Sequence, residues 1–232
     1  MQDTPDKSIF PSPLEADENG IVAFSFHIHV NMLKDAYRHG IFPWPCEERT
    51  ILWAAPRMRG VLPLEEVHIP DRLKRDMKKY EQKFDFRIDT AFSEVIRACA
   101  ASPRPEQEGT WITSKIIQGY EAFYKAGYVH SFEAFSRETG KLAGGLYGVS
   151  VGKIFCGESM FYRESGASKF AFVKMTECLK KLGVELLDTQ MVTNATMYFG
   201  AREIPSEDYL KQLKRLGGPP LDFSVFKGTP QN

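Results

Sequence analysis

The stretch from Gly144 to Gln190 constrains the fold of this chain more than any other. It predicts, in order, two strands rich in β-formers, a helix with apolar residues at helical spacing, and a third strand. The segments are residues 144–151 (GGLYGVSV), the turn Gly152-Lys153, residues 154–161 (IFCGESMF), the helix 168–182 ending before Gly183, and residues 184–191 (VELLDTQM). This order predicts a β-hairpin and a helix that crosses over to a parallel strand.

Strand alternation places polar side chains close together in this unit. Asp188 and Gln190 project from one side of their strand, and Cys156, Glu158 and Met160 are expected to share one side of theirs. Carboxylates inside an apolar sheet are usually paired or hydrogen-bonded. We therefore interpret these groups as a functional site, the alternative being a sheet edge open to water.

Composition narrows the class of protein. The chain has 232 residues and a formal net charge of zero, so no global field attracts nucleic acid or a membrane. We expect no signal peptide, and the sequence contains no long apolar run and no phosphate-loop, nucleophile-elbow or zinc-protease motif. The four cysteines, at 46, 99, 156 and 178, are far apart. We expect a cytoplasmic protein without disulfides or a metal site.

Two further features are candidates for binding. Prolines on both sides hold Trp44 in place, and Trp111 follows a polar loop, so both rings suit either a core or a ligand.

A predicted helix over residues 70–83 carries basic residues on one face. They are Arg72, Arg75, Lys79 and Lys83. This face is either a solvated surface or a docking strip for phosphates.

Three predicted helices place a tyrosine inward. They cover residues 31–39, 114–126 and 206–216 and bury Tyr37, Tyr120 and Tyr209. A change in composition after the second tryptophan segment suggests a boundary. We expect a small domain over residues 1–60 and a larger one over residues 61–232.

Several blocks of this sequence resemble one protein family along nearly the whole chain. The blocks are FPSP at 10–13, GIFPW at 40–44, GTWIT at 109–113, GGLYGV at 144–149, FCGESMF at 155–161, ASK at 167–169 and LDTQ at 187–190. In this combination they are similar to the bacterial leucyl/phenylalanyl-tRNA-protein transferases.

The resemblance implies an enzyme of the N-degron pathway. Such enzymes move leucine or phenylalanine from an aminoacyl-tRNA to the N-terminal α-amino group of a protein, and use no cofactor. The implied fold is α+β, with a small N-terminal α/β domain and a C-terminal acetyltransferase-like (GNAT-like) mixed sheet with flanking helices. That fold agrees with the hairpin and crossover predicted above. We expect a cytoplasmic monomer that does not bind membranes.

The resemblance also assigns roles to residues. Positions matching Asp188 and Gln190 serve proton transfer, and the one matching Glu158 holds the reacting amine. Those matching Trp44 and Trp111 contact the terminal adenosine. We expect an apolar slot for the donor side chain, with ordinary core packing as the alternative. Its expected lining is Leu146, Phe155, Met160, Phe172, Met175, Leu179 and Leu187.

The sequence departs from the family at three places. Residues 53–59 are WAAPRMR instead of WWSPDPR, residues 25–28 are SFHI instead of GGDL, and Ala195 replaces a common histidine. Members of the family typically tag proteins that begin with Arg or Lys. We expect these departures to lie where the acceptor peptide or the tRNA end approaches, so the acceptor residue here need not be Arg or Lys. Two alternatives stay open: an acetyl-CoA-dependent N-acetyltransferase, and a relative that binds N-terminal residues or tRNA without catalysis.

Overall fold

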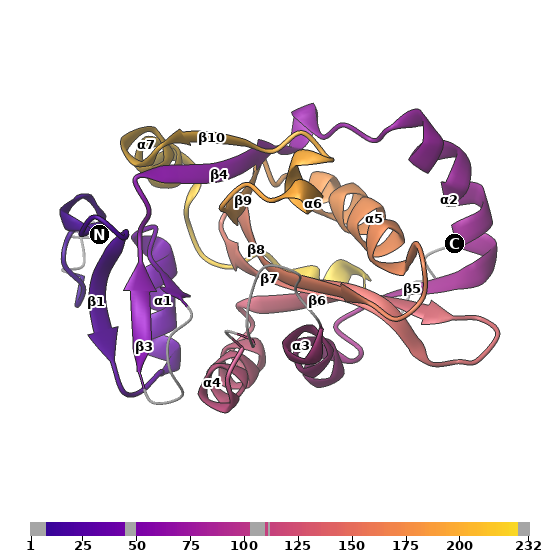
Figure 1. Cartoon of the computed structure of the whole chain (residues 1–232), viewed down its shortest axis with the longest axis horizontal. Helices are drawn as coiled ribbons and strands as arrows, with labels where there is room; N and C mark the ends of the chain where they lie inside the picture. Colours follow the sequence, from indigo (N-terminus) through magenta and orange to yellow (C-terminus); the bar gives the residue numbers. More distant parts are fainter. Residues whose placement is uncertain (1–7, 45–49, 103–109, 111, 227–232) are drawn as a thin grey trace.

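The computed structural model describes residues 8–44, 50–102, 110 and 112–226. In these ranges the chain forms one three-stranded and one seven-stranded sheet, with helices packed around them (Figure 1). The expected α+β class, with a mixed sheet and flanking helices, is confirmed. Among the described residues, no helix combines the length and apolar character needed to cross a membrane.

The small sheet belongs to the first part of the chain. Its antiparallel order is β1 (Ile21–Ser25), β3 (Ile51–Ala54) and β2 (Phe42–Trp44), next to helix α1 (Val30–Arg38). Trp53 on β3 is completely buried and its ring packs 4.7 Å from that of Phe10. This tryptophan is therefore part of the core.

The large sheet is antiparallel except at one pair of strands. Its order is β10 (Arg202–Pro205), β4 (Met58–Pro63), β9 (Leu186–Gln190), β8 (Ile154–Tyr162), β7 (Leu142–Val151), β6 (Val129–Ser136) and β5 (Phe84–Ile88). Only β8 and β9 of this sheet run parallel, joined by α5 (Ala167–Lys181). The predicted hairpin and crossover are confirmed.

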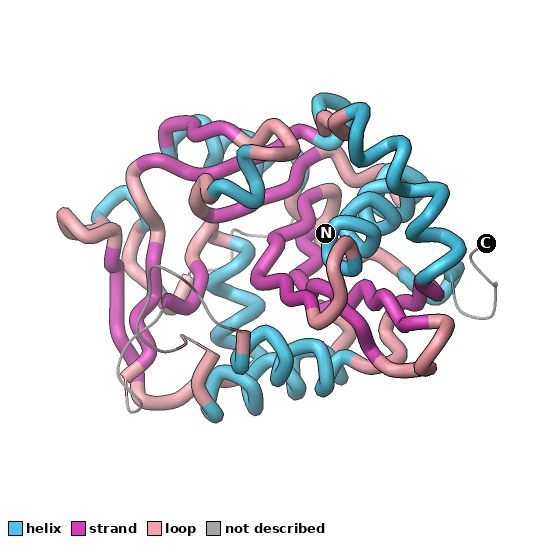
Figure 2. The backbone as a smooth tube through the Cα atoms, turned by 45° about the vertical axis from the view of Figure 1, so that its right-hand side comes forward, coloured by secondary structure: helices cyan, strands magenta, loops and turns pink. Residues whose placement is uncertain are grey.

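Helices cover both faces of the large sheet. On one face lie α5 and α2 (Asp71–Lys83), and on the other lie α3 (Phe92–Ala101) and α4 (Ser114–Lys125) (Figures 1 and 2). The C-terminal part adds α6 (Asn194–Met197) and α7 (Ser206–Leu216). Short 3₁₀ turns occupy Pro13–Glu15, Leu64–Glu66 and Phe223–Phe226.

A β-bulge changes which side chains share a face of β8. Tyr147 pairs with Ser159 but Gly148 pairs with Gly157, so Glu158 is an extra residue that reverses the alternation beyond it. Cys156 consequently packs in the core on the α3–α4 side, whereas Met160 packs on the α5 side. The expectation that Cys156, Glu158 and Met160 share one face is therefore wrong for Met160.

Candidate active site

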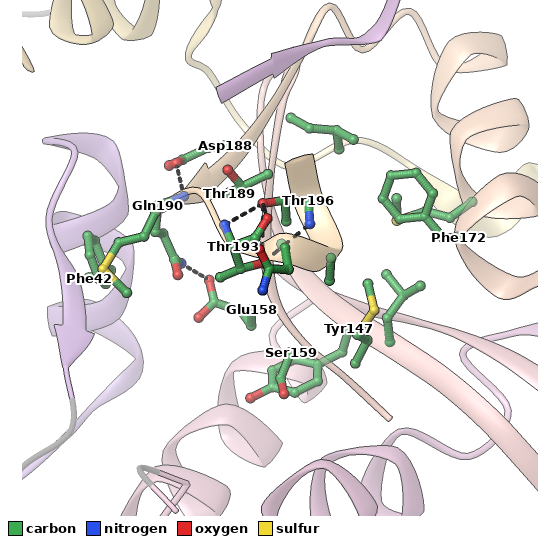
Figure 3. Close-up of a pocket in the computed structure, with 18 of the residues that line it drawn as sticks. Phe42, Tyr147, Glu158, Ser159, Phe172, Asp188, Thr189, Gln190, Thr193 and Thr196 are labelled. Atoms are coloured by element: carbon green, nitrogen blue, oxygen red, sulfur yellow. Dashed lines mark hydrogen bonds between the residues drawn. The ribbon is translucent and has the colours of Figure 1, made fainter. Parts of the chain in front are cut away.

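A cavity of about 570 Å³ opens where β8 and β9 separate (Figure 3). The two strands stay paired only as far as Cys156 and Asp188, and beyond this pair Glu158 and Gln190 face the opening. β2 provides one wall, and β7, α5 and α6 contribute to the rest. The predicted polar groups therefore meet at the head of one cavity.

Glu158 is held by side chains from three other elements. Its carboxylate accepts hydrogen bonds from the hydroxyls of Tyr37 on α1 (2.7 Å) and Tyr120 on α4 (3.0 Å), and from Nε2 of Gln190 (2.8 Å). Burial raises the pKa of Glu158 to about 7, against the lowering effect of these hydrogen bonds. This carboxyl group can therefore change charge near neutral pH.

Asp188 is completely buried and its carboxylate accepts four hydrogen bonds. Arg59 donates two, at 2.8 and 2.6 Å, and the hydroxyl of Tyr209 donates one at 2.8 Å. The fourth comes from the backbone N–H of Gln190 at 2.9 Å, whereas the side-chain amide of Gln190 turns to Glu158 (Figure 3). The geometry makes Asp188 a fixed partner of Arg59 that holds the backbone of Gln190.

Gln190 adopts an unusual backbone conformation. Its φ is +62°, in the left-handed region, where a residue other than glycine costs about 1–3 kcal/mol. The hydrogen bonds to Asp188 and Glu158 offset this cost and turn the amide into the cavity. Such strain is commonly found at functional sites.

Most of the predicted slot residues line the cavity. These are Leu146, Met160, Phe172, Met175 and Leu187, together with Trp44 on the wall formed by β2. Phe155 and Leu179 do not line it, because both are completely buried in the core between the sheet and α5. Trp111 lies outside the described residues.

The predicted basic helix is α2. Arg72, Arg75 and Lys79 are exposed on it, whereas the ammonium of Lys83 forms an ion pair with Glu164 at 2.9 Å. α2 packs against α5, and Lys169 on α5 lies 4.7 Å from the centre of the Tyr198 ring, directly after α6. Exposed positive charge therefore extends from α2 to Lys169 on α5, the helix that also lines the cavity.

Metal binding has no support in the described ranges. There, no group of three or more His, Cys, Asp or Glu side chains is arranged to hold a metal ion.

Sequence reasoning did not identify the side chains that hold the two carboxylates. Tyr37, Tyr120 and Tyr209 are buried as predicted, at 2%, 0% and 1% exposure, but their contacts with Glu158 and Asp188 were not anticipated. A usable signal was present, because a buried tyrosine hydroxyl usually needs a hydrogen-bond partner. No comparable signal distinguished Arg59 from the exposed Arg57 beside it.

The sequence is similar to known protein families. A model described as leucyl/phenylalanyl-tRNA protein transferase matches residues 61–214, and a model of the N-terminal domain of that protein matches residues 27–57. A transferase of this name from Anaeromyxobacter sp. (strain K) is 44% identical, covering 91% of this chain and 89% of the relative. Another, from Xanthomonas euvesicatoria pv. vesicatoria (strain 85-10), is 41% identical, covering 94% and 88%.

Among solved structures, L-PGS from Bacillus licheniformis is 12% identical, with a TM-score of 0.41, covering 77% of this chain and 55% of that one. The family models together match most of the chain, and they include the residues of the cavity described above. The chain therefore belongs to the leucyl/phenylalanyl-tRNA protein transferase family.

Proposed function

We propose that this protein transfers leucine or phenylalanine from an aminoacyl-tRNA to the N-terminal α-amino group of an acceptor protein, as a tag for degradation. Family membership supports this activity. The observation that carries it is the Glu158–Gln190 pair at the head of an apolar cavity with an aromatic wall. Polar groups that can bind an amine thus lie next to an apolar space that can hold the leucine or phenylalanine side chain of the donor.

The reaction needs positioning and removal of a proton. The acceptor nitrogen attacks the ester carbonyl carbon, a C–N bond forms, and the C–O bond to the ribose breaks. An α-ammonium has a pKa near 8, so a base improves the rate by roughly 10²–10⁴. Glu158, with a pKa of about 7, takes this proton and passes it to the ribose oxygen as that oxygen leaves, and Gln190 orients the amine. This division of roles differs from the one that the resemblance implies. Asp188 holds Gln190, since four donors already occupy its carboxylate.

The donor occupies the rest of the cavity. Leu146, Met160 and Phe172 surround an apolar side chain such as that of leucine or phenylalanine. The indole of Trp44 stacks on the terminal adenine, an interaction that contributes about 1–3 kcal/mol per base. We assign Trp111 to the same adenosine only on the family likeness.

The exposed basic residues of α2 bind phosphates of the acceptor stem. Contacts to phosphates add affinity without reading sequence. Binding that does not depend on sequence suits an enzyme that accepts both leucyl-tRNA and phenylalanyl-tRNA.

The domain boundary, the cellular compartment and the oligomeric state belong to the same proposal. A boundary near residue 60 is supported by the step from β3 in the small sheet to β4 in the large sheet. An aminoacyl-tRNA substrate and the buried cysteines at 99, 156 and 178 suit the cytoplasm. A monomer fits this proposal, because the Glu158–Gln190 pair and the apolar lining of the cavity already meet within a single chain.

The test uses purified protein, tRNA charged with labelled leucine or phenylalanine, and peptides that differ only in their first residue. We expect label on the N-terminus of at least one peptide, and a series with Arg, Lys, Asp and Glu first identifies the acceptor. Ribonuclease should abolish transfer and acetyl-CoA should not replace the charged tRNA. Acetylation of the peptides would instead support an N-acetyltransferase, and absence of any transfer by the wild-type protein would support a binding protein.

A further inference from the structure

We propose that Arg59 is a positioning residue that joins the donor side of the cavity to the amine side. The inference rests on the proposed function. Arg59 does not touch the cavity itself, and 2% of its side chain is exposed. Its role follows from contacts with four residues, which are Asp188, Gly40, Phe42 and Tyr209.

The amine side is fixed through Asp188. The guanidinium of Arg59 donates to both carboxylate oxygens, through Nε at 2.8 Å and Nη2 at 2.6 Å. This two-pronged geometry fixes the orientation of a carboxylate as well as its position. Oδ1 of Asp188 in turn accepts the N–H of Gln190, whose amide contacts Glu158. Arg59 thereby stabilises the left-handed conformation that turns Gln190 into the cavity.

The donor side is fixed through the backbone that leads into β2. Nη1 of Arg59 donates to the carbonyl oxygen of Gly40 at 3.0 Å, two residues before Phe42. The guanidinium carbon also lies 4.5 Å from the centre of the Phe42 ring, which packs 5.8 Å from the ring of Trp44. Both Phe42 and Trp44 line the cavity. The aromatic wall therefore rests against the same guanidinium.

Two aromatic rings pack against the guanidinium itself. The ring of Tyr209 on α7 lies 4.5 Å from the guanidinium carbon, on which Phe42 also packs. The Tyr209 hydroxyl donates to Asp188 at 2.8 Å. Burial lowers the pKa of Arg59, but the carboxylate of Asp188 more than compensates, so Arg59 stays charged. A lysine lacks the planar fork and cannot reproduce these contacts together.

The experiment measures kcat and KM for full-length Arg59→Lys and Arg59→Met. Binding of a non-hydrolysable phenylalanyl-adenosine analogue is measured in parallel. We expect kcat to fall by about 100-fold or more in both variants, because small displacements of reacting groups have effects of this size. We also expect weaker analogue binding. Arg215→Met is the control, because Arg215 forms an exposed ion pair with Glu185 and should behave like wild type.

A double-mutant cycle separates the two connections. In an Asp188→Asn background, Arg59→Met should lower kcat little further, because the path to Gln190 is already broken, yet it should still weaken analogue binding. Tyr209→Phe keeps the ring and removes one donor to Asp188, so a several-fold fall in kcat is expected. This variant also tests the inference if the Arg59 variants do not fold.

Specific results would overturn the inference. One is a folded Arg59→Lys variant with wild-type kcat and wild-type analogue binding. Another is full additivity of the effects of the Arg59 and Asp188 substitutions on kcat. Where the Arg59 variants do not fold, an unchanged kcat in Tyr209→Phe would overturn the inference. A wild-type protein that transfers no amino acid would contradict the proposed function instead. The two failures are thus distinguishable.

Discussion

Glu158 is the residue whose charge most directly controls the proposed reaction. Its pKa is raised to about 7 by burial, and only its ionised form accepts a proton from the amine. We expect kcat/KM to rise with pH through about 7, followed by a second rise near 8 as the amine itself loses its proton. The measurement is a pH profile with a short acceptor peptide.

The matched variant for this prediction is Glu158→Gln. It should lower the rate by roughly 10²–10⁴, keep the rise near 8, and lose the rise near 7. A rise near 7 that persists in Glu158→Gln would assign that titration to another group.

Tyr37 tunes Glu158 from the small sheet's side of the molecule. Its hydroxyl donates to the carboxylate, which favours the charged form and lowers the pKa of Glu158. Tyr37→Phe should therefore raise that pKa and move the lower rise in activity to higher pH, so the rate falls most below pH 7. Tyr162→Phe is the control, because Tyr162 lies on the same strand, β8, as Glu158 but is 68% exposed. An unchanged or lowered midpoint in Tyr37→Phe would contradict the assignment.

At the scale of elements, α2 makes a separable contribution. Reversing the charge of Arg72 and Lys79 to Glu should raise KM for aminoacyl-tRNA. In a plot of log KM against log salt concentration, the substitutions should also lower the slope by about one for each phosphate that α2 no longer binds. Transfer from phenylalanyl-adenosine, which has no acceptor stem, should be unaffected.

Lys125→Glu tests whether this effect is local to α2. Lys125 is exposed at the end of α4. Helix α4 lies on the face of the large sheet opposite to the one that α2 covers (Figure 1). An equal rise in KM from Lys125→Glu would indicate a general effect of charge rather than docking along α2.

In the molecule as a whole, the two sheets share one hydrophobic core. One cluster of buried residues includes Trp53 and Tyr37 from the first part of the chain together with Phe123 and Tyr147 from the second. The rings of Tyr37 and Phe123 stack 6.1 Å apart. A boundary in the sequence near residue 60 therefore does not imply two independent folding units.

We expect the full chain to unfold in a single thermal transition, because separating the sheets would expose this common core. Calorimetry should give equal calorimetric and van't Hoff enthalpies. Two resolved transitions, or a folded fragment spanning residues 61–232, would contradict the prediction.

Much of the architecture was predictable because it depends on neighbours in the chain. The alternation of residues in β7 and β8, the helical spacing in α5 and the turn at Gly152 are local patterns. The bulge at Glu158 was not predictable, because one extra residue in a strand depends on its pairing with β7. The prediction for Met160 was wrong because this bulge reverses the alternation of side chains beyond Glu158.

The amino-acid sequence alone was enough to predict the order of elements, the family, and the placement of Glu158, Asp188 and Gln190 on adjacent strands. The side chains that hold each of these groups could be identified only from tertiary packing. Glu158 meets Tyr37 across 121 positions of the chain, and Asp188 meets Arg59 across 129. Side-chain periodicity describes contacts within one element, whereas these contacts arise when separate elements pack and bury charged groups that must be paired.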